Sequence, residues 1–238
     1  MKIRTVAVSL SVIALTMVSQ AVLAGGATQG RTSMSSDSAL MTPSKLTEQA
    51  PANYDVKFVT TKGDFTVHVV RSLAPLGADR FYNLVKHGFY DDCTVFRVVP
   101  GFVIQFGISG TPKISSVWQN ANIKDDVVNG SNKKGTITFA MAGPNTRTTQ
   151  VFISLGNNAA LDSQGFAPFG QVTQGMSVVE SLYGGYADQP TGRQGEISTQ
   201  GNAYLKQNFP KLDSIISATI VGSGMAHHPA THTPAKSQ

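Results

Sequence analysis

The aromatic residues of this 238-residue chain are confined to its middle. The sequence contains 12 Phe, 6 Tyr and 1 Trp, and all of them lie between Tyr54 and Phe209. A packed core of this size needs large apolar side chains, so the interval marks the folded part of the chain. We therefore expect one domain over residues 52–221, preceded by a flexible linker at 25–51 and followed by a disordered tail at 222–238.

The first 24 residues have the pattern of a secretory signal peptide. Lys2 and Arg4 give a positive start, residues 6–18 are mostly apolar, and small or apolar residues precede Gly25. The apolar stretch is too short and too interrupted for stable membrane insertion. We therefore expect an exported protein, which would be periplasmic in a Gram-negative organism and secreted otherwise.

Charge and cysteine content exclude several classes of function. The formal net charge is only +5, and the basic residues are scattered, with Lys133 and Lys134 the one adjacent pair. So mild a charge argues against a nucleic-acid partner. Cys93 is the only cysteine, so neither an intramolecular disulfide nor a cysteine-based metal site can form. We expect it to be a small buried apolar residue.

Two further clusters could bind a metal, and we favour neither. Asp125 and Asp126 are adjacent, so their side chains should point in different directions. His227, His228 and His232 could hold a metal weakly, but no carboxylate or cysteine accompanies them, which favours a disordered tail. We therefore expect no metal and no cofactor.

Short β-rich runs recur through the domain. Residues 54–60 and 65–69 alternate around a Lys62-Gly63 turn and predict a hairpin. Further strands are predicted at 94–99, 102–106, 135–141, 149–154, 166–172 and 215–221. Helical spacing predicts one helix at 74–88 and a short one at 176–183, while 109–134 should be a structured loop and 184–210 a second excursion with a helical piece around 203–207. About eight strands and two helices favour a mainly β barrel or sandwich with helical caps.

Two polar residues interrupt the apolar strands on either side of Pro100-Gly101. Arg97 lies in Val-Phe-Arg-Val-Val and Gln105 in Phe-Val-Ile-Gln-Phe. An arginine is almost never fully buried unless it is paired. The stretch therefore indicates either a pocket wall with two aimed donors or an edge strand whose arginine faces solvent. Taken alone, it supports both equally.

Three blocks in order resemble the cyclophilin-type peptidyl-prolyl cis–trans isomerases. They are residues 96–105, residues 139–146 followed by 150–153, and Leu161-Asp162 followed by Phe169-Gly170. One block could arise by chance, but three at fitting spacing are highly specific. The resemblance implies a closed eight-stranded antiparallel barrel capped by two helices.

The resemblance also implies the site residues. Arg97 matches the catalytic arginine, and Gln105 lies beside it as a second catalytic residue. The positions that match the substrate-binding set are Phe102, Val103, Phe152 and Leu161 in the walls of a proline pocket, Ala140 and Met141 in an edge segment that binds peptide through its backbone, Gln150 beside the arginine, and Phe166 at the rim. A donor aimed at the prolyl nitrogen favours the twisted state of the bond, so the reaction needs neither nucleophile nor cofactor.

Five positions depart from the usual family pattern. Phe96 replaces a His, Phe106 a Gly, Met141 an Asn, Ala160 an aromatic residue, and Phe166 a His or Tyr. These changes leave the arginine and the proline pocket in place but make the rim more apolar and more open. We therefore expect an altered peptide preference and weak binding of the family's cyclic-peptide inhibitor. Phe96 and Phe106 either tune the pocket or only fill core space.

The sequence thus predicts a monomeric isomerase that acts on proline-containing segments of folding exported proteins. One alternative is a cyclophilin-like module, a peptide binder or chaperone with little turnover, although pure binding would not need Arg97. Another is an unrelated secreted β-barrel that binds a carbohydrate or small ligand, which would leave the three blocks as coincidence. No nucleic-acid partner is expected.

Overall fold

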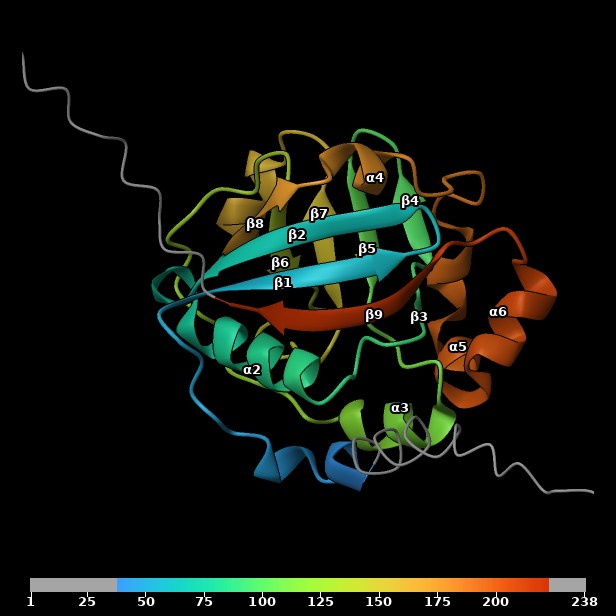
Figure 1. Cartoon of the computed structure of the whole chain (residues 1–238), viewed down its shortest axis with the longest axis horizontal. Coiled ribbons are helices and arrows are strands. Elements are labelled where there is room, and N and C mark those ends of the chain that lie inside the picture. The colour runs from blue at the N-terminus through green and yellow to red at the C-terminus, as the bar shows by residue number, and fades with distance from the viewer. Residues whose placement is uncertain (1–37, 223–238) are drawn as a thin grey trace, which may run out of the picture.

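The computed structural model describes residues 38–222, which form one curled antiparallel sheet with helices around it (Figure 1). The strand order is β3-β9-β1-β2-β8-β6-β7-β5-β4. The strands are β1 (Asn53–Thr60), β2 (Gly63–Val70), β3 (Cys93–Thr94), β4 (Arg97–Val99), β5 (Val103–Phe106), β6 (Thr136–Phe139), β7 (Val151–Ser154), β8 (Pro168–Gln174) and β9 (Ser214–Val221). The mainly β, antiparallel prediction is confirmed.

The prediction of a closed eight-stranded barrel is wrong in detail. The sheet has nine strands, and β3 and β4 stand at its two ends with no ladder between them among residues 38–222. These two strands are nevertheless neighbours in the chain, separated only by Val95 and Phe96. The single strand expected at 94–99 pairs first with β9 and then with β5, so it counts as two. The two ends of the sheet are therefore joined by the covalent chain through Val95 and Phe96, and not by hydrogen bonds between β3 and β4.

The core is an aromatic cluster inside the curl of the sheet. Strand β1 buries every second residue, as its alternation predicted. Phe58 of β1 stacks on Phe65 of β2 with ring centroids 4.7 Å apart, and Phe106 of β5 meets Phe58 edge-on at 5.7 Å. All four residues of β5 and of β7 are buried, because both faces of these strands are covered.

Helix α2 (Pro75–Lys86) covers the sheet beneath β9 and β1 (Figure 1). It buries Ala78, Phe81 and Leu84 and begins at a proline, which suits the first helical turn. Asp126 caps it: the carboxylate accepts the N–H groups of Leu76 at 2.9 Å and Gly77 at 2.8 Å. These are donors that a helix start leaves without an intrahelical partner.

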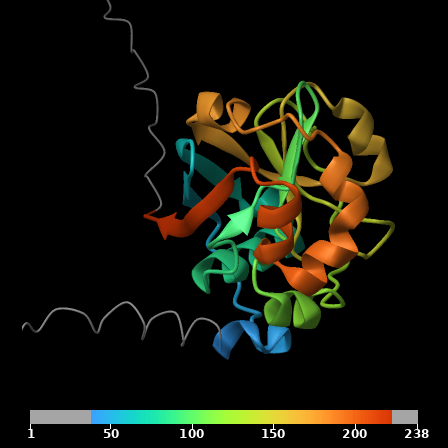
Figure 2. The same ribbon diagram turned by 90° about the vertical axis from the view of Figure 1, so that its right-hand side faces the viewer.

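The remaining helices lie in the C-terminal half and in the two excursions. They are α3 (Pro112–Trp118), α4 (Met176–Glu180), α5 (Gln194–Gln200) and α6 (Asn202–Asn208), with 3-10 turns η1 (Pro43–Lys45), η2 (Arg71–Leu73), η3 (Ala159–Gln164) and η4 (Gln189–Arg193). The pieces expected near 176–183 and 203–207 are confirmed, whereas the loop prediction for 109–134 is wrong at α3. Figure 2 shows α5 and α6 together on one flank of the sheet, next to α3.

Residues 38–51 pack against the domain, which corrects the prediction of a flexible linker for this segment. Leu40 is 2% exposed. Its carbonyl accepts the indole N–H of Trp118 at 2.8 Å, and the carbonyl of Glu48 accepts the side-chain amide of Asn83 at 2.6 Å. The first 13 residues of the predicted linker, the predicted signal peptide, and the tail with its three histidines lie outside the described residues.

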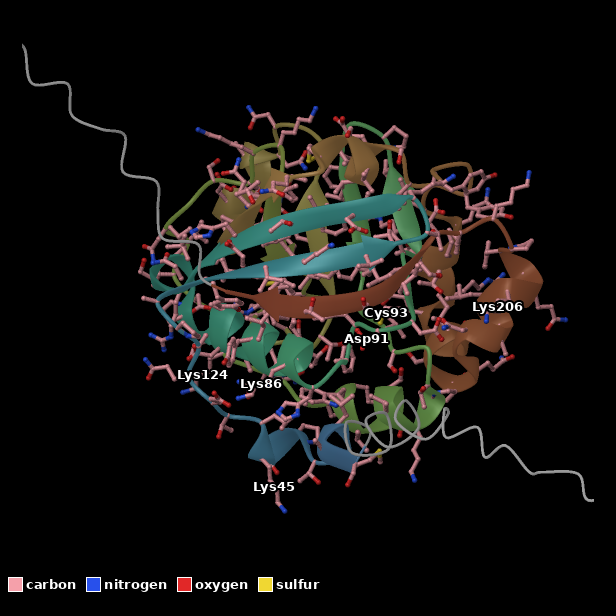
Figure 3. The ribbon with its side chains drawn as sticks, in the orientation of Figure 1. Lys45, Lys86, Asp91, Cys93, Lys124 and Lys206 are labelled. Carbon is pink, nitrogen blue, oxygen red and sulfur yellow. The ribbon has the colours of Figure 1, made fainter. Side chains whose placement is uncertain are left out.

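Cys93 is buried on β3, as expected (Figure 3). Its thiol donates to the carbonyl of Ile108 at 3.4 Å, and burial raises the pKa of the thiol above its usual range. An inert structural role follows, because the thiolate is the reactive form. Figure 3 also shows Lys45 and Lys206 at separate places on the outside of the molecule, in keeping with scattered basic charge.

Replacement of Leu40 tests whether the segment before β1 belongs to the domain. Leu40→Ala removes a buried side chain and leaves a cavity, so we expect a loss of about 2–4 kcal/mol in the free energy of unfolding, measured in urea. Leu76→Ala is the control, because Leu76 is 43% exposed and should cost about 0.5 kcal/mol or less. Equal stability of the two variants would contradict the packing of this segment.

Candidate active site

The hairpin of β4 and β5 brings the two interrupting polar residues together. Arg97 and Gln105 are direct cross-strand partners, so their side chains stand on one face. Gly101 closes the turn with φ of +74°, a conformation that favours glycine. The Nη1 of Arg97 donates to Oε1 of Gln105 at 3.1 Å. The structure thus decides for a pocket wall over a solvent-facing edge.

A chain of hydrogen bonds runs from Arg97 across three glutamines. Gln105 donates from Nε2 to Gln150 at 2.9 Å, and Gln150 donates in turn to Gln194 of α5 at 2.8 Å. On its other side, the Nε of Arg97 donates to the carboxylate of Asp188. These partners fix the plane of the guanidinium from two directions.

The guanidinium lines a mainly apolar cavity of about 200 Å³. Its Cζ lies 5.4 Å from the ring centre of Phe102, within the range of a cation–π contact. Phe152 and Phe166 meet edge-on at 5.7 Å inside it. The residues that line it are Arg97, Phe102, Val103, Gln105, Ala140, Met141, Phe152, Leu161, Phe166 and Thr191. Nine of the ten site residues expected from the sequence are therefore in one cavity, and Gln150 is one hydrogen bond away.

A second cavity, of about 400 Å³, adjoins the first along the edge segment after β6. The two share Gln105, Ala140 and Met141. The N–H of Ala140 is already bonded to the carbonyl of Gln150 at 2.9 Å. The site is therefore a groove with two basins, and Ala140 and Met141 line both of them.

Leu161 is held in the pocket wall by its neighbour Asp162. The carboxylate accepts the hydroxyl of Ser131 at 2.6 Å and both the backbone and side-chain N–H of Asn132, at 2.9 and 2.7 Å. Burial opposes ionisation of this carboxyl group, but the hydrogen bonds outweigh it and lower the pKa of Asp162. The charged form thus stabilises η3.

Phe96 and Phe106 fill core space and do not line either basin of the groove. Phe106 is fully buried among the aromatic rings of the main core. Phe96 belongs to a second buried cluster with Ile108, Ile197 of α5 and Leu205 of α6. This second cluster joins the arginine-bearing chain to the helices of the 184–210 excursion.

The sequence did not identify Gln119, Asn122, Ala142, Thr146 and Thr148, which line the second cavity. It also missed three site residues of the 184–210 excursion. They are Asp188, which pairs with Arg97, Thr191, which lines the apolar cavity, and Gln194, which ends the amide chain. The excursion has no period and no motif that would have found them. The one indication in the sequence was Phe96. An aromatic residue next to Arg97 needs apolar neighbours, and the excursion supplies them.

The two acids that could have suggested a metal site have other partners. Asp126 is paired with Arg147 at 3.0 Å besides capping α2, and Asp125 accepts the N–H of Asn145 at 2.8 Å. Within residues 38–222, no three His, Cys, Asp or Glu side chains are grouped as metal ligands. In the same range, no helix is long and apolar enough to cross a membrane.

Comparison with known proteins identifies the family. The model described as "Cyclophilin type peptidyl-prolyl cis-trans isomerase/CLD" matches residues 55–201. The chain belongs to this family. A peptidyl-prolyl cis-trans isomerase of Acinetobacter baylyi is 34% identical over 182 residues, which cover 74% of this chain and 89% of the relative. The cyclophilin is therefore an isomerase of X–Pro bonds.

Further relatives agree. Peptidyl-prolyl cis-trans isomerase B of Escherichia coli is 30% identical over 175 residues, 70% of this chain and 98% of the relative. Among solved structures, a cyclophilin-type isomerase of Cryptosporidium parvum matches with a TM-score of 0.54 at 18% identity, covering 72% of this chain and 99% of its own. At that identity the match speaks for the fold alone.

Replacement of Asp162 tests the support of the pocket wall. Asp162→Asn gives up charge-assisted hydrogen bonds, so we expect a loss of about 1–3 kcal/mol in the free energy of unfolding at neutral pH. Because the folded-state pKa is lowered, this contribution is present above the unfolded pKa of about 3.9 and disappears as pH falls through the folded value. Urea denaturation of both proteins from pH 7 to pH 2 measures it.

Ser163→Ala is the matched control, since that exposed hydroxyl bonds only within its own turn. A stability difference between wild type and Asp162→Asn that stays constant down to pH 2 would contradict the role of the ionised carboxylate.

Proposed function

We propose that this cyclophilin catalyses X–Pro isomerisation in exported proteins, with Arg97 as the catalytic residue and Gln105 beside it. The observation that carries the proposal is the position of the guanidinium, which is fixed by side chains on two sides and lines a mainly apolar cavity. A charged hydrogen-bond donor beside an apolar cavity suits a reaction in which the proline ring is held still while the X–Pro amide bond rotates.

The chemistry requires stabilisation of a twisted amide and no bond cleavage. Resonance gives the amide a rotational barrier of about 18–20 kcal/mol, and uncatalysed X–Pro exchange takes on the order of tens of seconds. In the twisted state the prolyl nitrogen regains its lone pair. Arg97 already uses Nε and Nη1 on Asp188 and Gln105, which leaves Nη2 to donate to the substrate. A donor that is stronger toward the twisted state than toward either planar state lowers the barrier.

The groove also has places for the rest of the peptide. The proline ring would enter the cavity between Phe102, Phe152 and Leu161. Because the N–H of Ala140 is occupied, the carbonyl of Ala140 and the N–H of Met141 are left for the peptide backbone. A solved Cryptosporidium parvum cyclophilin of the same fold was studied in the presence of the dipeptide Ala-Pro, which supports a small X–Pro ligand.

Export is supported by the pattern of residues 1–24, and we expect the mature protein to be a monomer. We propose that the mature protein begins near Gly25, carries its isomerase domain up to residue 221, and acts on newly exported chains outside the cytoplasm. Size-exclusion chromatography with light scattering should give the mass of a single chain.

Replacement of the arginine tests the catalytic role. Arg97→Ala removes the donor to the prolyl nitrogen, so we expect kcat/KM for an Ala-Ala-Pro-Phe peptide to fall by about 100-fold or more. Arg97→Lys should also be poor, because an ammonium group cannot reproduce the planar fork. Exchange spectroscopy by NMR measures the rates without a coupled protease.

Arg193→Ala is the control for loss of a positive charge, because Arg193 is exposed and pairs with Glu196. Near-wild-type turnover of Arg97→Ala would refute the catalytic assignment. Retained peptide binding without any turnover in the wild type would instead favour a cyclophilin-like binding module.

Expression of the full chain in a Gram-negative host tests export. We expect the protein in the periplasmic extract, with an intact mass that begins at Gly25. Leu15→Arg interrupts the apolar stretch and should leave an uncleaved chain in the cytoplasm. An uncleaved wild-type chain in the cytoplasm would refute the proposed localisation.

A further inference from the structure

The residues just before η4 place a carboxylate beside the arginine of the active site. The Oδ1 of Asp188 accepts from Nε of Arg97. The Asp188 side chain is 59% exposed and that of Arg97 only 23%, so the carboxylate is on the solvent side of the pair. Asp188 is therefore at the rim of the groove, where a residue that flanks the bound proline would pass.

The same segment presents a second polar group to the groove. Thr191, three residues after Asp188, lines the apolar cavity. Its hydroxyl oxygen is buried and has no hydrogen-bond partner among residues 38–222. A buried hydroxyl without a partner is costly, and a ligand in the cavity would give it one. The Asp188 carboxylate beside Arg97 and the unpartnered Thr191 hydroxyl are thus two independent signs that residues 188–191 contact the substrate.

The backbone is bent to hold Asp188 in place. Ala187 has φ of +47°, a left-handed conformation that residues with a side chain rarely adopt. Its N–H donates to the carbonyl of Gly184 at 3.0 Å, which closes the turn. Such backbone persists only where the surroundings enforce it, and it gathers at functional sites.

The excursion behind this segment is attached firmly to the sheet. The Phe96 cluster joins α5 and α6 to the chain before β4. At the start of α6, Asn202 donates to the carbonyl of Asp92 at 2.7 Å and accepts the hydroxyl of Thr94 at 3.0 Å. The helices that follow Asp188 are thus fixed to the sheet, and Asp188 itself is held by its hydrogen bond with Arg97.

We infer that Asp188 determines specificity by offsetting the charge of Arg97 and favouring a basic residue next to the substrate proline. A guanidinium alone at the rim would repel Lys or Arg and attract Asp or Glu. The neighbouring carboxylate cancels that field and attracts a cation directly. Because both groups are partly exposed, the effect should be modest and should weaken with salt. The inference rests on the proposed role of Arg97.

The test compares matched peptides that carry Lys or Glu directly before or directly after proline. For each position, the ratio of kcat/KM for the Lys peptide to that for the Glu peptide is measured by NMR exchange with the mature protein. We expect Asp188→Asn to lower this ratio about two- to five-fold at low salt, in at least one position. In about 0.5 M NaCl, where charges are screened within a few Å, the two proteins should converge.

Two variants make the result specific to this carboxylate. Glu196→Gln removes the same charge from the same excursion, but Glu196 pairs with Arg193, so the ratio should not change. Asp188→Glu should restore most of the preference. An unchanged ratio in Asp188→Asn, with turnover intact, would overturn the inference alone. A wild-type protein that accelerates no peptide would overturn the proposed function and this inference with it.

Discussion

The active site depends on one cross-strand pair, Arg97 opposite Gln105. Their register on β4 and β5 puts a permanent cation and an amide on one face at hydrogen-bonding distance. A slip of one residue would turn both side chains to the other face of the sheet. Both residues line the apolar cavity, and Arg97 has the glutamine chain on one side and a carboxylate on the other.

The pair solves a conflict between chemistry and burial. Catalysis needs a desolvated donor, since charge interactions strengthen away from water, but an unpartnered cation in such a place is costly. The structure leaves Arg97 about one-quarter exposed and gives two of its three nitrogens fixed partners. Neutral amides hold it on one side without cancelling its charge. The third nitrogen then needs no reorganisation to meet the substrate.

Sequence patterns predicted local elements well and their assembly less well. The β1–β2 hairpin, α2 and the groove residues from 97 to 166 follow from alternation, helical spacing and motif order. The open sheet was missed because pairing partners of the 93–99 stretch are set by tertiary contacts that no local pattern encodes. Helix α3 was missed because a seven-residue helix shows too little period. The packing of residues 38–51 was missed because it rests on a few small or isolated apolar side chains and on hydrogen bonds of the backbone. Asp188 and Gln194 depend on how a distant excursion folds back.

The position of Phe96 has a consequence for protein engineering and for recombination between homologues. Successive residues of an extended chain point to opposite sides, so Arg97 enters the groove while Phe96 is buried between α5 and α6. The helical excursion therefore cannot be exchanged between homologues by joining its two ends alone, because it also packs against Phe96. A chimera that received this excursion but kept a small polar residue before its arginine would have a hole behind the guanidinium. In such a chimera the arginine side chain would no longer be held in a defined position, although the fold would remain.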